Sequence, residues 1–243
     1  MGIRLGMITP SLNTVLEPVT YRLLHDLPDV SAHFSRVRVT QISLDDNCAD
    51  QFAAAPMIEA ARLLMDAHVD AICWNGTAGC WLGVENDAAL CAAISEAVGV
   101  PVTSATQAVT GLFQEAGVTK FGLVTPYVED LQRQIVAKYS DAGFQCVGEA
   151  HLGRDDGFNF AQIEDVIWRK MIREVAVSGP QAITTMCTNI NGAPLAEAME
   201  RETGIPLIDS ISASLWAAMK LAGSNPARIT GWGKMFAGFS AVV

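Results

Sequence analysis

The amino-acid sequence contains an internal repeat, and this repeat limits the possible fold more than any other feature. Residues 6–10 (GMITP) return as residues 122–126 (GLVTP), residues 71–77 (AICWNGT) align with residues 182–188 (AITTMCT), and residues 99–102 (GVPV) align with residues 204–207 (GIPL). Three matches in the same order indicate two homologous halves. The alternative is that such short pieces with glycine and proline recur by chance in chains of this class.

Within each half, short runs rich in Val, Ile and Leu alternate with segments of helical period, a pattern typical of an α/β protein with parallel sheets. The predicted strands are residues 3–9, 34–41, 71–74, 100–102, 121–125, 145–152, 182–185 and 205–208. The clearest predicted helices are residues 57–67, 131–139 and 163–176. We expect two pseudo-symmetric halves, each a parallel sheet flanked by helices, at residues 1–114 and 115–215. We expect residues 216–243 to pack back on the N-terminal half.

Composition excludes several classes of partner. Half of the 243 residues are apolar and 17% are charged, so the chain can bury a large core and is expected to be soluble and globular. A net charge of −10 provides no basic surface for nucleic acid or an anionic membrane. The first residues lack the pattern of a signal peptide and no stretch resembles a membrane span, so a cytoplasmic protein is expected. The oligomeric state stays open, a homo-oligomer included.

Polar residues follow several of the predicted strands directly. They lie in residues 10–14, 75–79, 126–127 and 187–189. In open parallel sheets, ligands bind outside the carboxyl ends of the strands. The repeat pairs the first segment with the third and the second with the fourth, so Gly76 and Cys187 are expected to face each other across a cleft between the halves.

The residue types in these segments favour binding of a carboxylate. Asn, Thr and Tyr side chains, together with backbone N–H groups at helix N-termini, can donate hydrogen bonds to a carboxylate or a developing oxyanion without a metal or cofactor. Two facing thiols could remove a proton from one face of a carbon and return it on the other, whereas one thiol serves one face. A single thiol at Cys187 opposite Gly76 therefore argues against a two-base racemase.

These motifs give the chain a family resemblance over nearly its whole length. The carrying segments are Asn13 and Thr14 after Thr9-Pro10, residues 71–83 (AICWNGTAGCWLG), Tyr127 after Thr125-Pro126, Cys187-Thr188-Asn189, and residues 231–236 (GWGKMF). Together they resemble the Asp/Glu racemase superfamily, in the branch that contains arylmalonate decarboxylase and maleate cis-trans isomerase. The resemblance implies a cofactor-free enzyme with two flavodoxin-like halves, an active site between them, and usually one catalytic Cys at each paired strand end.

The sequence combines features of both enzymes. Cys187 matches the second catalytic Cys, while Gly76 takes the place of the first, as in the decarboxylase. Ala78 replaces a serine common at the decarboxylase oxyanion site, and Asn13 and Asn159 resemble the isomerase pattern. The resemblance therefore implies a decarboxylase or an isomerase acting on a small dicarboxylate.

We predict Cys187 as the catalytic acid. The predicted substrate-binding residues are Asn13, Gly76, Thr77, Ala78, Tyr127, Asn159 and Thr188, and no metal ligand is predicted. Each position also has a purely structural interpretation: a buried thiol at Cys187, a helix cap at Asn13, a turn at Asn159. Gly76 is interpreted as allowing substrate or backbone to approach closely, and Cys80 is an alternative source of the missing thiol.

The predicted function is a cofactor-independent decarboxylase of a substituted malonate-type diacid, in which Cys187 protonates an enediolate from one face. The first alternative is a maleate-type cis-trans isomerase or racemase of the same superfamily. The second is a dicarboxylate-binding module without catalytic activity.

Overall fold

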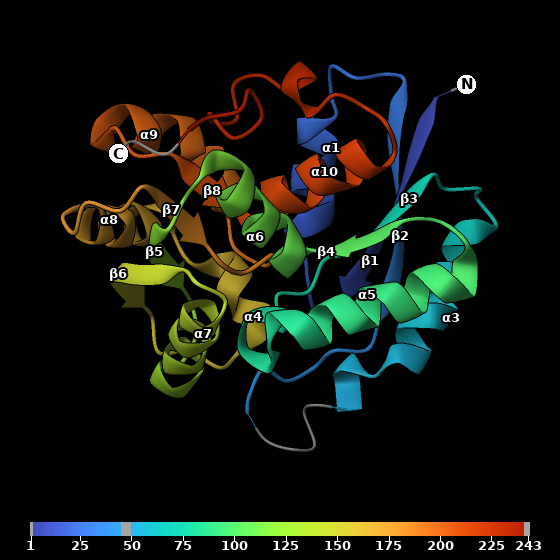
Figure 1. Ribbon diagram of the computed structural model, residues 1–243, viewed down its shortest axis with the longest axis horizontal. Helices are drawn as coiled ribbons and strands as arrows, with labels where there is room; N and C mark the ends of the chain where they lie inside the picture. The colour runs from blue at the N-terminus through green and yellow to red at the C-terminus, as the bar shows by residue number, and fades with distance from the viewer. Residues whose placement is uncertain (1, 45–49, 241–243) are drawn as a thin grey trace.

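The computed structural model, which describes residues 2–44 and 50–240, contains two parallel sheets of four strands each (Figure 1). The first has the order β2-β1-β3-β4 and the second β6-β5-β7-β8. The strands are β1 (Ile3–Pro10), β2 (Val30–Val37), β3 (Ala71–Trp74), β4 (Val102–Ser104), β5 (Lys120–Thr125), β6 (Gln145–His151), β7 (Ala182–Thr185) and β8 (Leu207–Asp209). The same strand order in both sheets confirms the predicted α/β fold of two related halves.

Helices cover both faces of each sheet, as buried parallel strands require. In chain order they are α1 (Leu16–Leu23), α3 (Ala54–Met65), α4 (Gly79–Leu82), α5 (Val84–Val98), α6 (Ala105–Ala116), α7 (Glu129–Asp141), α8 (Asp165–Ala176), α9 (Ala196–Thr203) and α10 (Ser210–Leu221). Short 3-10 turns are η1 (Asp50–Phe52), η2 (Gly157–Gln162), η3 (Ala193–Leu195) and η4 (Pro226–Arg228). None of the described helices has both the length and the apolar composition of a membrane span.

The central strands begin and end within one residue of the predicted ranges, and three of the four outer strands differ by more. β3 and β7 coincide with the predicted ranges, whereas β2 begins and ends four residues earlier. The cause is register: β1 pairs with β2 from Ile3 opposite Val30 to Pro10 opposite Val37, so residues 38–41 have no partner strand. β4 begins at Val102 because Gly99 caps α5 in the left-handed conformation and Pro101 has no N–H for a ladder.

Helices α6 and α10 lie side by side between the two sheets (Figure 1). Helix α10 packs on β3, β4 and α1 of the first half, although it follows the last strand of the second half. From α6, Phe113 contacts Phe121 and Tyr139 of the second half, with ring centroids 5.3 and 6.2 Å apart. Each of these helices therefore ties one half of the chain to the other.

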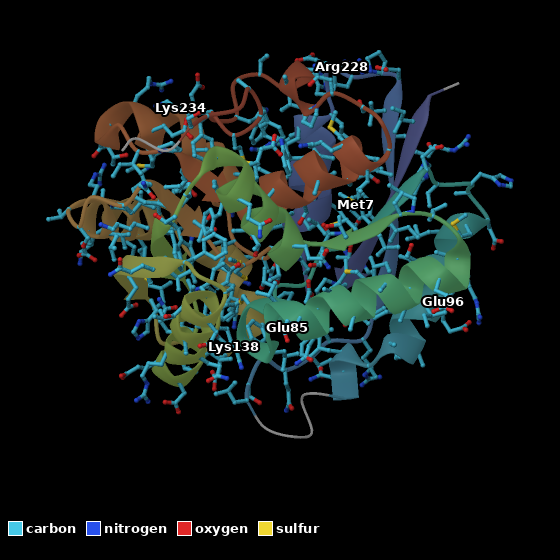
Figure 2. The ribbon with its side chains drawn as sticks, in the orientation of Figure 1. Met7, Glu85, Glu96, Lys138, Arg228 and Lys234 are labelled. Carbon is cyan, nitrogen blue, oxygen red and sulfur yellow. The ribbon has the colours of Figure 1, made fainter. Side chains whose placement is uncertain are left out.

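The segment after α10 contacts both halves. Arg228 donates hydrogen bonds to both carboxylate oxygens of Asp29, which precedes β2, at 2.9 and 2.5 Å. Farther along, the backbone N–H of Lys234 donates to the Glu200 carboxylate of α9. Figure 2 shows Arg228 beside the N-terminal half and Lys234 over α9. The domain limits at residues 114/115 and 215/216 stay a prediction.

Candidate active site

A small cavity lies where the carboxyl ends of β1, β3, β5 and β7 meet, and it joins seven of the eight predicted site residues. Its lining consists of Pro10, Leu12, Asn13, Val39, Ile42, Phe52, Gly76, Thr77, Ala78, Trp81, Tyr127, Cys187, Thr188 and Asn189. The cavity measures about 40 Å³, well below the roughly 300–1,000 Å³ of ordinary ligand pockets. Its walls must therefore separate to admit a diacid.

Cys187 follows β7 and has 3% of its surface exposed, in the lining of this cavity. Burial raises the pKa of its thiol to about 11, and the nearby Asp209 carboxylate acts in the same direction. The backbone N–H of Asn189, which donates to Sγ at 3.4 Å, and a hydrogen bond with Tyr127 oppose that rise. The thiol is therefore protonated at neutral pH, the state that a proton donor needs and a nucleophile does not.

Tyr127 and Thr77 join the two halves at the cavity. The Tyr127 hydroxyl lies 2.8 Å from Thr77 Oγ1, and both side chains are almost fully buried. The rings of Trp81 and Phe160 contact the Tyr127 ring with centroids at 5.4 and 5.9 Å. Burial raises the pKa of the Tyr127 phenol well above its usual value, so it stays a donor. Thr77, Tyr127 and Cys187 are thus connected by hydrogen bonds, and all three side chains are uncharged and carry a polar hydrogen.

Asn13 and Thr188 also line the cavity, but their polar atoms are engaged with the protein. Asn13 Nδ2 donates to Thr188 O at 2.9 Å and to Thr188 Oγ1 at 3.0 Å. Asn13 Oδ1 accepts the N–H groups of Val15 and Leu16 at the start of α1. Thr188 Oγ1 donates to Asn75 O at 2.6 Å. We call this set of buried hydrogen bonds between the two halves the clamp. A ligand could bind the Asn13 or Thr188 side chain only by breaking one of these hydrogen bonds.

Asn159 is the one predicted site residue that the structure places outside the cavity. It lies in η2, where its Nδ2 donates to Asp156 Oδ2 at 3.1 Å, and it lines a separate surface hollow. Asn189 takes a site position instead, with Oδ1 accepting from Thr14 N at 2.9 Å and Nδ2 donating to Gly157 O at 2.8 Å. The sequence could have indicated this role for Asn189, because residues 187–189 directly follow a predicted strand.

Five apolar side chains of the lining form what we call the apolar wall, and the sequence did not mark them as site residues. It consists of Leu12, Val39, Ile42, Phe52 and Trp81. Two of them, Ile42 and Phe52, lie in the connection between β2 and α3, away from any strand end. Within the described residues, the lining contains no Lys, Arg, His, Asp or Glu. A bound carboxylate would therefore meet neutral donors and hydrocarbon in this lining, and no charged partner.

Gly76 lines the cavity, but the reason for glycine differs from the one predicted. A Cβ placed on its backbone would lie 2.1 Å from Cζ2 and 2.4 Å from Cε2 of Trp74, far inside contact distance. Its φ is not positive, so backbone conformation does not require glycine. The indole of Trp74, rather than a substrate, takes the room of a side chain at this position.

Cys80, the alternative source of a second thiol, lies in α4 and is fully buried. It is not part of the cavity lining, unlike Ala78 just before the helix. Burial and the nearby Asp87 carboxylate raise the pKa of the Cys80 thiol well above its usual value. In the described part of the chain, no group of three or more His, Cys, Asp and Glu residues is arranged to hold a metal ion.

Two α/β halves with a thiol in the cavity between them are the architecture expected of the Asp/Glu racemase superfamily. The model of the arylmalonate decarboxylase family matches residues 27–236, so the chain belongs to this family. This match confirms the predicted resemblance.

Relatives of two activities are similar to the chain. Arylmalonate decarboxylase of Bordetella bronchiseptica is 24% identical over 235 residues, which cover 96% of this chain and 95% of the relative. Maleate isomerase of Nocardia farcinica is 26% identical over 255 aligned positions, covering 100% and 99%. The family thus includes decarboxylases and maleate isomerases, and the chain is about equally distant from both.

Solved structures of both enzymes share the fold. A Cys-to-Ser mutant of the Nocardia farcinica maleate cis-trans isomerase, with a covalently bound succinylcysteine intermediate, aligns with a TM-score of 0.89 at 22% identity, covering 97% of this chain and 98% of the other. A liganded mutant of arylmalonate decarboxylase, with one Gly-to-Cys and one Cys-to-Ser change, aligns with a TM-score of 0.85 at 22% identity, covering 96% and 98%.

Proposed function

We propose that this protein is a cofactor-independent decarboxylase of a substituted malonate-type diacid, with Cys187 as its single proton donor. The observation that carries the proposal is the composition of the cavity: one neutral thiol, the Thr77 and Tyr127 hydroxyls, the apolar wall and no charged side chain in its described lining. We infer that the lining holds one carboxylate by hydrogen bonds, because the polar atoms of Asn13 and Thr188 are engaged with each other. An isomerase acting on maleate has to hold two carboxylates through the reaction.

The carboxylate that stays in the product is assigned to the Thr77 and Tyr127 hydroxyls. They are paired with each other at 2.8 Å, and such a pair uses only one of its two hydrogens. Donors of this kind stabilise the charge that builds on the retained carboxylate as it becomes an enediolate. The Asn13 and Thr188 side chains keep this part of the cavity in place through their clamp across the halves.

The carboxylate that leaves is assigned to the apolar wall of Leu12, Val39, Ile42, Phe52 and Trp81. A carboxylate there loses its hydration without gaining a charged partner, which raises its free energy. Neutral CO2 pays no such cost against apolar side chains. Loss of CO2 leaves the carbon–carbon bonding pair on the enediolate. The apolar wall therefore raises the free energy of the bound diacid relative to that of the enediolate and CO2.

Cys187 then transfers its thiol proton to the α-carbon, and a thiolate remains. The N–H of Asn189 stabilises that thiolate through a hydrogen bond. Water returns the proton before the next turnover. The net reaction converts a diacid dianion and one proton into a monoacid anion and CO2, and the proton arrives from one face only.

The test is to offer an arylmalonate, an alkylmalonate and maleate separately, and to follow CO2 and the organic product by NMR. We expect the protein to release CO2 from at least one malonate, Cys187→Ala to lose that activity, and Cys146→Ala to keep it. Cys146 is a suitable control because its half-buried thiol lies on edge strand β6 and bonds Gly148 O, away from the cavity lining.

Two outcomes would replace the proposal with its alternatives. Conversion of maleate to fumarate without CO2 would identify an isomerase. Tight dicarboxylate binding without turnover, unchanged in Cys187→Ala, would identify a binding module.

A further inference from the structure

We propose that Trp74 is the residue that makes this a one-thiol site: its indole ring occupies the room that a second acid–base side chain at position 76 would need. The steric part of this inference stands by itself, and its consequence for the reaction rests on the proposed function.

The overlap between Trp74 and position 76 is severe. Three atoms of the six-membered ring, Cζ2, Cε2 and Cη2, lie 2.1, 2.4 and 2.9 Å from the ideal Cβ position on Gly76. Carbon atoms that are not bonded to each other stay about 3.5–4.0 Å apart at optimal contact. Even alanine at this position therefore requires the ring to move.

The ring has little freedom to move. Trp74 is 1% exposed and belongs to a buried cluster that includes Ile8, Val39, Met57 and Ile94. Cores of this kind are packed at nearly crystalline density, so displacing an indole forces its neighbours off their rotamers. Because Val39 also lines the cavity, a shift of this cluster would disturb the active site itself.

The second half of the chain provides an internal comparison. The repeat aligns Trp74 with Thr185 and Gly76 with Cys187. Thr185 is small, and its Oγ1 donates to Asp209 Oδ2 at 2.9 Å. The half with a small strand-end residue carries the thiol, and the half with the large one carries glycine. Trp74 and Gly76 therefore form a matched pair, and the ring size at position 74 decides how many thiols the cavity can hold.

The first experiment measures this coupling without any substrate. Gly76→Ala is made in the natural chain and in Trp74→Val, where valine copies the shape of Thr185 but leaves no unpaired hydroxyl. We expect Gly76→Ala to lower Tm by several degrees, or to prevent folding, in the natural chain, and to change Tm by less than about 2 °C in Trp74→Val, because the clash is then absent.

Gly111→Ala is the matched control, since a Cβ there meets nothing within 4 Å, and it should change Tm equally in both backgrounds. Equal losses from Gly76→Ala in the two backgrounds would overturn the proposal, as would a failure of Trp74→Val/Gly76→Ala to fold when Trp74→Val alone folds.

The second experiment asks whether removing the ring changes the chemistry. In Trp74→Val/Gly76→Cys the introduced thiolate can take the α-hydrogen of a 2-arylpropionate from one face while Cys187 delivers its proton to the other. We expect racemisation with deuterium uptake in D2O at least tenfold faster than in the natural chain or in either single variant, and its loss when Cys187→Ser is added. Racemisation by Gly76→Cys alone, at the rate of the double variant, would overturn the proposal.

The two experiments separate this inference from the proposed function. Coupling between positions 74 and 76 in a protein that releases no CO2 from any malonate would contradict the proposed function and leave the steric inference supported. Release of CO2 from a malonate, without coupling between positions 74 and 76, would support the proposed function and contradict the steric inference.

Discussion

The pKa of Cys187 gives a sharp prediction for pH dependence. Burial raises it from 9.0 to about 11. At pH 10 a thiol of pKa 11 is about 91% protonated, whereas one of pKa 9 is only about 9% protonated. Since a proton donor works in its protonated form, kcat should change little between pH 7 and pH 9 and keep most of its neutral value at pH 10. An ordinary thiol would instead lose about tenfold.

Two measurements check this prediction. The first is kcat under saturating malonate from pH 7 to 10.5, with far-UV circular dichroism at each pH to confirm that the protein stays folded. The second is alkylation by iodoacetamide, resolved by mass spectrometry, in which only the thiolate reacts. The Cys187 peptide should label with a midpoint near pH 11. A midpoint near pH 9 in both measurements, in folded protein, would refute the argument from burial.

Three further predictions concern the clamp, the hydroxyl pair and a buried carboxyl. Asn13→Asp keeps an acceptor for the start of α1 but removes both donors to Thr188, so urea unfolding should show a loss of about 1–3 kcal/mol or more; unchanged stability would contradict the clamp. Tyr127→Phe removes one of the two hydroxyls and should lower kcat about 10²-fold in steady-state assays of the folded variant; an unchanged kcat would remove Tyr127 from the site. Burial raises the pKa of Asp209 from 3.8 to about 7, so the folded state binds its proton more tightly and stability falls as pH rises through that window; Asp209→Asn should reduce this fall in urea melts at pH 5 and 8, and an unchanged slope would contradict it.

The sequence predicted the parts of the molecule that depend on chain order. The repeat and the alternation of apolar runs predicted two parallel sheets of the same strand order. The rule that parallel strand ends meet at one edge then brought Thr77, Tyr127 and Cys187 into one cavity. Both inferences need only the direction of strands, which the pattern of apolar residues determines.

The direction in which individual side chains point could not be predicted from the sequence. Asn13 and Thr188 were predicted to bind substrate, and the structure shows that they bind each other, because two loops 175 positions apart meet there. Asn159 follows a glycine and resembles a site residue, yet η2 turns it toward Asp156. The role of Gly76 depends on the orientation of the Trp74 ring, which no spacing reveals.

The residues of the apolar wall were not predicted, for a related reason. Val39, Ile42 and Phe52 lie between β2 and α3, where neither period nor repeat gives a position relative to the sheets. They line the cavity together with residues that follow the strand ends. The preference for a decarboxylase therefore gains its main physical support from side chains that the sequence did not mark as site residues.

The central claim is that one thiol delivers one proton to one face of an enediolate. Its most direct test is proton NMR with chiral analysis of the monoacid formed in D2O from a malonate that carries one aryl and one methyl group, with Cys187→Ala beside the natural chain. The account predicts a single enantiomer with one deuterium at the α-carbon, and no product from Cys187→Ala. A racemic product, or equal turnover by Cys187→Ala, would contradict it.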